Sequence, residues 1–584
     1  MKFRIASLVV LMQLSACSPA PQQSTPEREV REPEAATGFA DNEAVETEKF
    51  MVTAANPHAV EAGYRVLKQG GSAVDAAIAV QAMLGLVEPQ SSGIGGGAFI
   101  LYWDNNEHKL YTIDAREKAP KAATPALFLD ENGVAPKWIE AVVGGRSVGV
   151  PGVLRGLELA HNKWGKMPWE PLFKDAIALA NKGFEVSPRL SKLVSMVMNP
   201  GLPKMPVASA YFYPDGEPLQ AGDILVNKPY ARSLTMIAEQ GADAFYTGPL
   251  AKQIADAVQN SPIHPGLLSV EDLANYHAKL REPVCGEYRQ YTVCGMGPPS
   301  SGGITTLQTL GILENFAVPD MPVNGEQFAH VFTQASRLAF ADRNQWIADT
   351  DFVDVPIDKM LNKDYLAQRA TLIGEKDMGK AQPGEWLEPE KAQDVAYELP
   401  NTSHITIVDA EGNVLSMTTS IEMGFGSTVM TGGFLLNNQL TDFSLNPKID
   451  GHWIANRVES EKRPRSSMSP TIILNKDGSK VLHALGSPGG SRIINYVTQT
   501  AIGLMDWKLN MQQAIDLGHI TNRNDYTALE QGTDVAKLAE KLKARGHDVK
   551  VMDLNSGLHG ISLLSNGKLQ GGADPRREGI VMGE

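Results

Sequence analysis

The stretch Pro400-Asn401-Thr402-Ser403-His404-Ile405-Thr406-Ile407-Val408-Asp409 predicts an alternating β-strand that begins with a threonine. A turn at residues 410–413 and a second strand over residues 414–420 follow it. If the peptide bond between Asn401 and Thr402 is cut, Thr402 becomes the first residue of a new chain. An α-amino group has a pKa of about 7.7–8.0, so a useful fraction is neutral at pH 7. It can accept the proton of the threonine's own hydroxyl, directly or through one water. The stretch therefore predicts a nucleophile that carries its own base, although Thr-Ser-His also begins many ordinary strands.

The composition of the whole chain narrows the class of protein. The chain has 584 residues, enough to bury a large core. Its net charge of −14 and the absence of a basic stripe argue against a role in nucleic-acid binding. A hydrophobic content of 43% with 7% aromatic residues is typical of a soluble globular protein.

The first 17 residues are typical of a targeting segment rather than of a fold. Lys2 and Arg4 precede an apolar run over residues 5–14, which is shorter than the ~20 residues that span a bilayer. The run ends in Leu14-Ser15-Ala16-Cys17 and resembles a bacterial lipoprotein signal, in which Cys17 is the lipidated residue. The alternative is an ordinary signal peptide that is simply removed. By the resemblance, the protein is exported to the periplasm, and Ser18 after the cysteine favours the outer membrane.

Residues 18–49 are rich in Pro, Glu, Gln, Ser and Thr, a composition that predicts a flexible tether. Beyond it only two cysteines remain, Cys285 and Cys294, at the two ends of a predicted tight hairpin. In an oxidising compartment they are a possible disulfide, and the alternative is two half-buried thiols. Their spacing fits no zinc site, and we expect no metal.

The body of the chain mixes predicted helices and strands. Asn56-Pro57 begins one helix, and Ser72 to Asp75 forms a capping box for a second, apolar helix that runs to about Leu86. The glycine-rich run from Gly93 to Gly97 contains G-x-G-x-x-A, but it follows a helix and leads into a strand, which argues against a dinucleotide site. Helices are predicted over residues 151–164, 172–183, 228–259 and 326–342, with more strands after Thr402. The class is α/β or α+β with a layered core.

Several distinctive segments occur in order along residues 50–584. They are Gly93 to Gly97 with Asp114-Ala115-Arg116-Glu117, Pro298 to Gly303, Thr402 to Glu422, Leu436 to Phe443, Lys462 to Pro470 with Gly486 to Gly490, and Asp574 to Arg577. Together these segments resemble the γ-glutamyltransferases (glutathione hydrolases), which are N-terminal nucleophile hydrolases.

The resemblance implies a four-layer αββα sandwich and a precursor that cuts itself. The Thr402 hydroxyl would attack the carbonyl carbon of Asn401, convert the amide to an ester, and water would release two chains. The heavy chain would then comprise residues 50–401 and the light chain residues 402–584, and the two chains would pair in one compact catalytic unit.

The resemblance also assigns the catalytic groups. Thr402 would attack the γ-amide carbonyl of a glutamyl donor and form an acyl-enzyme, and its amine would pass the proton to the leaving amine. The backbone N–H groups of Gly489 and Gly490 would form the oxyanion hole, since glycine allows close approach of the backbone. Ser420 would orient the amine of Thr402.

The amino-acid end of the donor needs partners for both of its charges. By family position, Arg116 would bind the α-carboxylate in bidentate fashion, with Ser466 and Ser467 as hydroxyl donors. Acceptors for the α-ammonium group would be Glu422, Gln439 and Asp442. The loop over residues 444–461 is of intermediate length, so Trp453 is either a partial lid or a surface aromatic.

The resemblance implies hydrolysis of glutathione and related γ-glutamyl compounds, with transfer to water or to an amino acid or peptide, and it implies no cofactor. Its small-molecule partners are these donors and acceptors, and its only contact with a membrane would be the lipid anchor. One alternative is a glutaryl or cephalosporin acylase of the same family, which cleaves glutaryl or similar side chains from β-lactam nuclei. Asp442 argues against it, because a glutaryl group lacks the ammonium group that Asp442 would bind. Another is an uncleaved lipoprotein with a binding or structural role.

Overall fold

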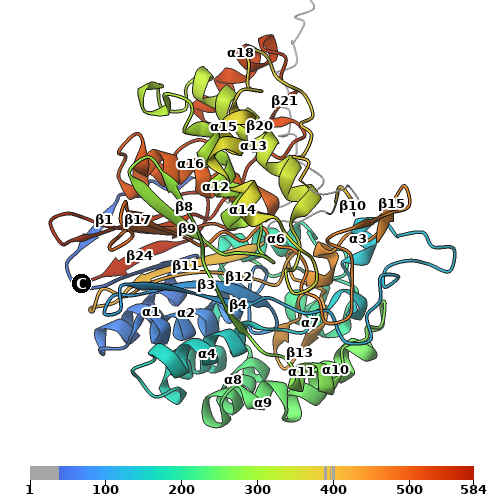
Figure 1. Cartoon of the computed structure of the whole chain (residues 1–584). Coiled ribbons are helices and arrows are strands. Elements are labelled where there is room, and N and C mark those ends of the chain that lie inside the picture. The colour runs from blue at the N-terminus through green and yellow to red at the C-terminus, as the bar shows by residue number, and fades with distance from the viewer. Residues whose placement is uncertain (1–38, 387–390, 395, 397–400) are drawn as a thin grey trace, which may run out of the picture.

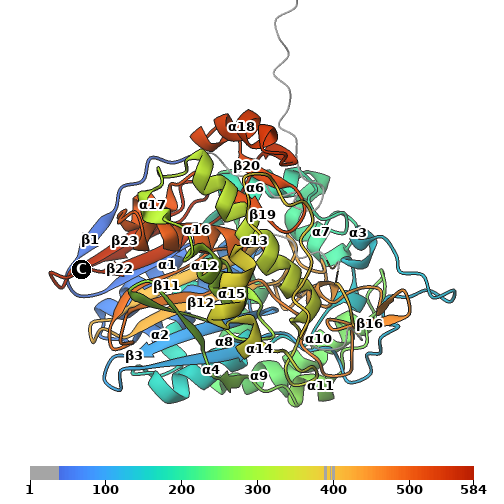
Figure 2. The ribbon, with the colours of Figure 1, turned by 45° about the horizontal axis from the view of Figure 1, so that its top comes forward.

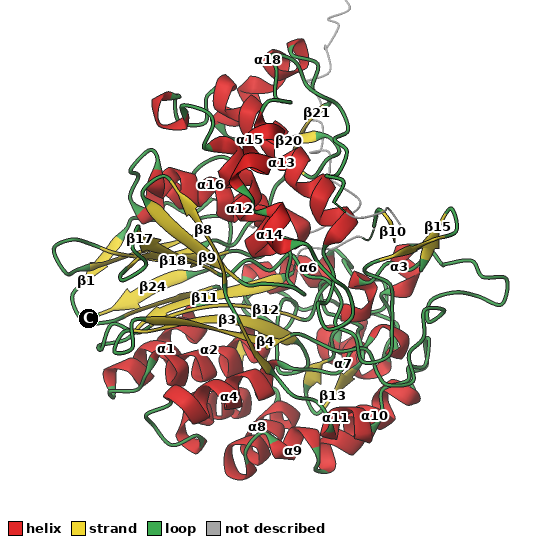
Figure 3. Cartoon of the chain, in the orientation of Figure 1, coloured by secondary structure: helices red, strands yellow, loops and turns green. Residues whose placement is uncertain are grey.

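The computed structural model describes residues 39–386, 391–394, 396 and 401–584. Two β-sheets lie face to face, and helices cover the outer face of each (Figure 1). Coloured by secondary structure, the same view shows the strands as two central layers between helices (Figure 3). This arrangement confirms the predicted αββα sandwich.

Each central sheet has seven strands, and neighbouring strands are antiparallel. The first sheet has the order β24 (Ile580–Gly583), β2 (Met51–Ala54), β11 (Thr402–Val408), β12 (Val414–Ser420), β3 (Gly97–Asp104), β4 (Lys109–Ala115) and β7 (Lys279–Arg281). The second has the order β1 (Val45–Thr47), β23 (Leu569–Ala573), β22 (His559–Leu563), β18 (Val481–Gly486), β17 (Thr471–Asn475), β9 (Tyr291–Gly295) and β8 (Val284–Tyr288).

The helices form the two outer layers (Figure 2). Beside the first sheet lie α1 (Pro57–Lys68), α2 (Ala73–Val87), α4 (Val153–Trp164), α5 (Lys174–Lys182), α8 (Lys228–Gln240), α9 (Asp243–Tyr246) and α10 (Pro249–Gln259). Beside the second lie α12 (Gly302–Leu313), α13 (Glu326–Trp346), α16 (Ile493–Met505) and α17 (Met511–Ile515). The helix predicted over residues 228–259 is broken into three, because Gly241 (φ 77°) ends the first and Gly248-Pro249 begins the last.

The predicted caps of the first two helices are present. The Asn56 side chain accepts a hydrogen bond from the N–H of His58, and Ser72 and Asp75 form a reciprocal capping box. Every residue of α2 is buried. Its apolar surface therefore contributes to the core all round the helix, as its composition predicts.

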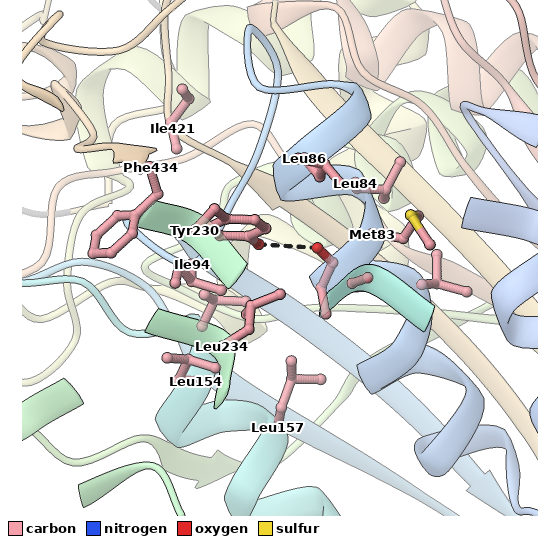
Figure 4. Close-up of a cluster of buried hydrophobic side chains, with 14 of the residues drawn as sticks. Met83, Leu84, Leu86, Ile94, Leu154, Leu157, Tyr230, Leu234, Ile421 and Phe434 are labelled. Atoms are coloured by element: carbon pink, nitrogen blue, oxygen red, sulfur yellow. Dashed lines mark hydrogen bonds between the residues drawn. The ribbon is translucent and has the colours of Figure 1, made fainter. Parts of the chain in front are cut away.

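One hydrophobic cluster lies between the first sheet and its helices (Figure 4). Tyr230 of α8 is fully buried, and its hydroxyl donates to the carbonyl oxygen of Ala82 at 2.9 Å. Ile94 and Ile421 belong to the same cluster. The glycine-rich run and the end of β12 are therefore anchored in the core.

Strand β11 is buried along its whole length, on both faces. The alternating pattern in the sequence of β11 therefore does not distinguish a solvent-exposed face from a buried one. One face packs against the helices of its own layer and the other against the second sheet, where polar side chains such as His404 and Thr406 bond to each other. A sheet covered on both faces has no solvent-facing side.

The predicted tether is too long at its C-terminal end. Residues 45–47 form β1, which pairs with β23 at the edge of the second sheet. Asn42 donates to the carbonyl oxygen of Ala573 at 3.1 Å. The open edge of β23 offers backbone partners to this polar segment, so residues 39–49 belong to the fold. Cys17 and residues 18–38 lie outside the described residues. The described part of the chain contains no helix with the length and apolar character that a bilayer crossing demands.

Candidate active site

Most of the predicted site residues line a single small cavity. They come from segments that are far apart in the sequence. The lining residues are Arg116, Thr402, Ser420, Glu422, Gln439, Asp442, Ser466, Ser467, Met468, Gly490 and Ile493.

Thr402 and Ser420 lie directly opposite each other at the adjoining ends of β11 and β12. The Thr402 hydroxyl donates to the Ser420 hydroxyl at 3.2 Å, and the Ser420 hydroxyl donates to the carbonyl oxygen of Asn401 at 3.2 Å. The N–H of Glu422 donates to the Ser420 oxygen at 2.8 Å and fixes its orientation. In the uncut chain, Ser420 therefore links the attacking hydroxyl to the carbonyl group that it would attack.

The bond between Asn401 and Thr402 is held from both sides. Asn401 is fully buried and has a φ of 155°, a backbone conformation that side chains of L-residues rarely adopt. On the other side, the guanidinium of Arg577 donates to the carbonyl oxygen of Thr402 at 3.2 Å. Burial lowers the pKa of Arg577 to about 10, against the opposing effect of Glu88. Arg577 belongs to the quoted Asp574 to Arg577 motif, but we predicted no role for it.

The glycine-rich run from Gly93 to Gly97 packs closely against the end of β12 and against Glu117. A Cβ atom at Gly96 would lie 2.0 Å from the carbonyl oxygen of Ser420, and one at Gly97 would lie 2.4 Å from the Glu117 carboxylate. The run therefore serves close backbone packing, and this explains its composition without a nucleotide. Glu88, just before the run, is fully buried; burial and the nearby Glu578 raise its pKa to about 8.

The second glycine run occupies a different backbone conformation. Gly489 and Gly490 have φ values of 135° and 56°, in the region that favours glycine. A Cβ atom at Gly489 would lie 2.6 Å from the ring of Tyr496. Gly490 lines the cavity beside Thr402. The run thus brings the backbone of Gly490 to the wall of the cavity, and its role as an oxyanion hole stays a prediction.

Arg116 follows β4 and is fully buried. Its guanidinium donates to the Asp442 carboxylate and to the backbone carbonyl oxygens of Pro464 at 3.2 Å and Arg465 at 2.9 Å. Burial on its own would lower the pKa of Arg116, but the Asp442 and Glu117 carboxylates outweigh it and hold the pKa above its usual value. The arginine is therefore a fixed cation at the wall of the cavity.

The three predicted acceptors lie next to one another. The Gln439 side-chain amide donates to Asp442 at 3.1 Å and to Glu422 at 3.4 Å. Glu422 has a φ of 77° and directly follows the turn out of β12. This group of acceptors is suited to an ammonium ion, next to the arginine that suits a carboxylate.

Ser466 and Ser467 also line the cavity, directly after Arg465, and Arg343 is a residue that our sequence reasoning missed there. Arg343 of α13 donates to the hydroxyls of Ser467 at 2.7 Å and Ser301 at 2.9 Å. The N–H of Ser301 donates to the carbonyl oxygen of Ser466 at 2.7 Å. Arg343 sits in the middle of a long helix with no distinctive motif around it, so no local signal could have identified it.

The other predicted features lie away from the cavity. Cys285 and Cys294 are joined in a disulfide across β8 and β9. Trp453 is 41% exposed and lies between the cations of Lys448 and Arg457, so in this structure it is a surface aromatic. The described residues hold no group of three or more His, Cys, Asp or Glu side chains suited to a metal ion.

Comparison with known proteins gives a consistent result. A family model described as "Gamma-glutamyltranspeptidase" matches residues 59–584. A "Glutathione hydrolase proenzyme" of Bacillus subtilis is 39% identical over 548 residues, with 91% of each chain covered. One of Escherichia coli is 38% identical over 543 residues, again with 91% of each chain covered. Among solved structures, a cephalosporin acylase from Bacillus halodurans superimposes with a TM-score of 0.81 at 27% identity, covering 93% of this chain and 97% of its own.

Proposed function

This chain belongs to the gamma-glutamyltranspeptidase family, and from that premise we propose that it cleaves the γ-glutamyl amide bond of glutathione and related compounds. It is an enzyme of the hydrolase and acyltransferase class, made as a proenzyme. The γ-glutamyl group is carried on Thr402 and is passed to water or to an amino acid or peptide. The observation that carries this proposal is the chain of hydrogen bonds from the Thr402 hydroxyl through Ser420 to the carbonyl oxygen of Asn401.

Maturation begins with the attack of the Thr402 oxygen on the carbonyl carbon of Asn401. Ser420 accepts a hydrogen bond from the attacking hydroxyl and polarises the carbonyl that is attacked. The amide becomes an ester, water hydrolyses it, and the heavy chain ends at Asn401 while the light chain begins at Thr402. The new α-amine of Thr402 is then the base for each turnover.

The same cavity then accepts the donor. The α-carboxylate binds the Arg116 side with Ser466 and Ser467, and the α-ammonium group binds Glu422, Gln439 and Asp442. Backbone N–H groups of Gly489 and Gly490 stabilise the oxyanion that forms on the attacked carbonyl. With these acceptors beside Arg116, the cavity is matched to an amino acid rather than to a simple dicarboxylate.

The intact masses of the purified protein and of a Thr402→Ala variant, under denaturing and reducing conditions, test this mechanism. We expect two chains that divide between Asn401 and Thr402 in the wild type and one chain in the variant. A single chain in both would overturn self-cleavage and support the uncleaved binding protein. Two chains in both would show that the cleavage does not depend on the Thr402 side chain.

A second candidate activity is the acylase reaction, because a cephalosporin acylase shares the fold over most of both chains. The acidic group of Asp442 and Glu422 argues against it, since a glutaryl group has no ammonium ion to bind there. Relative kcat/KM on γ-glutamyl and glutaryl p-nitroanilide separates the two. A preference for glutaryl would replace our assignment.

We further propose that the protein is exported to the periplasm and is anchored there to the outer membrane through a lipid on Cys17. The basic and apolar sequence before Cys17 supports this. Incorporation of labelled fatty acid in the wild type, and its loss in Cys17→Ser, is the expected result. Equal labelling of both, or of neither, would contradict the anchor.

A further inference from the structure

Asp394 is a buried acid eight residues before Thr402, and it lies where the two sides of the amino-acid pocket are held together. Its carboxylate forms an ion pair with Arg465 at 2.9 Å, and both side chains are 1% exposed. The same carboxylate oxygen accepts a hydrogen bond from the Asn456 side-chain amide at 2.9 Å. Just before Asp394, β10 (Lys391–Ala392) pairs with β16 (His452–Ile454), which lies between β10 and β15 (Lys448–Ile449) in a three-stranded sheet.

The Arg465 contact leads to the side of the pocket suited to a carboxylate. The backbone carbonyl oxygen of Arg465 accepts a hydrogen bond from the Arg116 guanidinium at 2.9 Å. Arg465 directly precedes Ser466 and Ser467, which line the cavity. Because Asp394 holds the side chain of Arg465, it fixes the backbone that these three groups share.

The Asn456 contact leads to the side suited to an ammonium ion. The Asn456 amide also donates to the backbone carbonyl oxygen of Asp442 at 2.8 Å. The side-chain oxygen of Asn456 accepts the N–H of Arg465 at 2.9 Å. Asp394 is therefore joined to Asp442 through one fully buried side chain, and the two sides of the pocket meet at its carboxylate.

The backbone of Asp394 is held by the helix that orients Ser467. Its N–H donates to the carbonyl oxygen of Asn344 at 2.9 Å. The preceding residue, Arg343, donates to the hydroxyl of Ser467. The second carboxylate oxygen of Asp394 accepts the N–H of Ala396 at 2.8 Å. The backbone and the side chain of Asp394 are therefore both held in place, the side chain by its ion pair with Arg465.

We propose that Asp394 is a positioning residue for recognition of the amino-acid end of the donor. This inference rests on the proposed function: after the cut, Asp394 belongs to the heavy chain, while Arg465, Asn456 and Asp442 belong to the light chain. Removal of the acid leaves the Arg465 charge buried without this carboxylate, a strongly unfavourable state. The loop that carries Ser466 and Ser467 then shifts, and displacement of these binding groups by about 1 Å can cost on the order of 100-fold, which here appears as weaker binding of the donor and a higher KM.

The test is steady-state kinetics of Asp394→Asn on γ-glutamyl p-nitroanilide, with rates divided by the fraction of cleaved chains on a denaturing gel. We expect KM to rise at least about tenfold, with kcat within about threefold of wild type, because Asp394 touches neither β11 nor β12. The inhibition constant of L-glutamate should rise by the same factor as KM. Asn456→Ser, which leaves the ion pair in place, should change KM in the same direction and decides the matter if Asp394→Asn does not fold.

Asp506→Asn is the matched control, since Asp506 is a buried acid that accepts from Arg289 and Tyr288 at the far end of α16. It should lower thermal stability and leave KM unchanged. An equal rise of KM in this control, or an unchanged KM in Asp394→Asn and Asn456→Ser, would overturn the positioning role alone. Absence of γ-glutamyl turnover in the wild type would overturn the proposed function and this inference with it.

Discussion

In the proposed active site, the half that holds the nucleophile (the nucleophile half) and the half that would bind the amino-acid end of the donor (the recognition half) are built in different ways. Thr402 and Ser420 are cross-strand neighbours on one hairpin, so the register of two strands places them together. The recognition half is assembled from Arg116 after β4, Asp442 in a short 3-10 turn, and Ser467 in an extended loop. The register of a hairpin fixes the relative positions of its own residues. The loops instead depend on contacts with buried charged side chains from other segments, such as Arg343, which donates to Ser467.

The largest effect is expected in the nucleophile half. Thr402→Ala removes both the hydroxyl and the means of releasing an α-amine, so cleavage should stop and turnover should fall by roughly 10⁴- to 10⁶-fold. Chain integrity on a denaturing gel and release of p-nitroaniline measure the two losses. Thr402→Ser keeps the hydroxyl and should still yield two chains. Full turnover in Thr402→Ala would show that the hairpin does not carry the chemistry.

The next largest effect is expected in the recognition half. Arg116→Lys keeps a positive charge but loses the planar fork that reaches Asp442 and two backbone carbonyls. We expect kcat/KM to fall by about 100- to 1,000-fold, as for disruption of a buried ion pair, mainly through KM. Arg65→Lys, in an exposed pair with Glu61, is the control and should have no effect. A loss that appears in kcat instead would mean that the two halves are not separable.

A smaller effect is expected for Ser420→Ala, which leaves Thr402 in place but removes its bridge to the Asn401 carbonyl. Self-cleavage should slow by about 10- to 100-fold, the scale of losing one hydrogen bond that strengthens in a transition state. A time course of chain separation after synthesis measures it. Ser420→Thr retains the hydroxyl and should cleave at close to the normal rate. If self-cleavage of Ser420→Ala is not slower than that of the wild type, Ser420 has no role in maturation.

The same contrast explains what could be predicted from the sequence. The strand–turn–strand pattern around Thr402 predicts the hairpin, because this pattern is local and needs no knowledge of the rest of the fold. The family resemblance implied that Ser420 acts on Thr402, and the structure pairs the two residues across the hairpin. Asn56 and the Ser72 to Asp75 box likewise predict helix starts that the structure has. These are local interactions, and their signals are local too.

Arg343 and Asp394 could not be predicted, because their significance lies in contacts with segments far away in the chain. Arg343 contacts Ser467, 124 positions later in the sequence, and Asp394 contacts Asn456, 62 positions later. The prediction for residues 39–49 failed for a related reason. Their polar composition suggests a tether, but the edge of β23 offers backbone partners, with which β1 pairs, and composition does not reveal them. The features that we could not predict from the sequence therefore all depend on contacts between segments far apart in the chain.

The smallest expected effect concerns pH, since each half contains a buried carboxyl group whose pKa is raised. Burial, with a contribution from Glu578, raises the pKa of Glu88 behind the nucleophile to about 8. Burial also raises the pKa of Glu117 beside Arg116 to about 8, although the arginine opposes it. In the unfolded chain both groups release their protons near their usual value of about 4.3.

Between about pH 4.3 and pH 8 these two groups hold protons in the folded state that the unfolded state has lost, so their contribution to the free energy of unfolding falls as the pH rises through this window. Each group contributes a slope of at most about 1.4 kcal/mol per pH unit. Glu88→Gln and Glu117→Gln should each remove one such contribution, so that the apparent Tm at pH 7.5 rises relative to that at pH 5.5, and the double variant should show a larger change. Glu61→Gln, on the surface of α1, should show no such change. If only one of the two variants shows this change, then only that half of the site holds a proton at neutral pH, and the two halves differ in electrostatics as well as in construction.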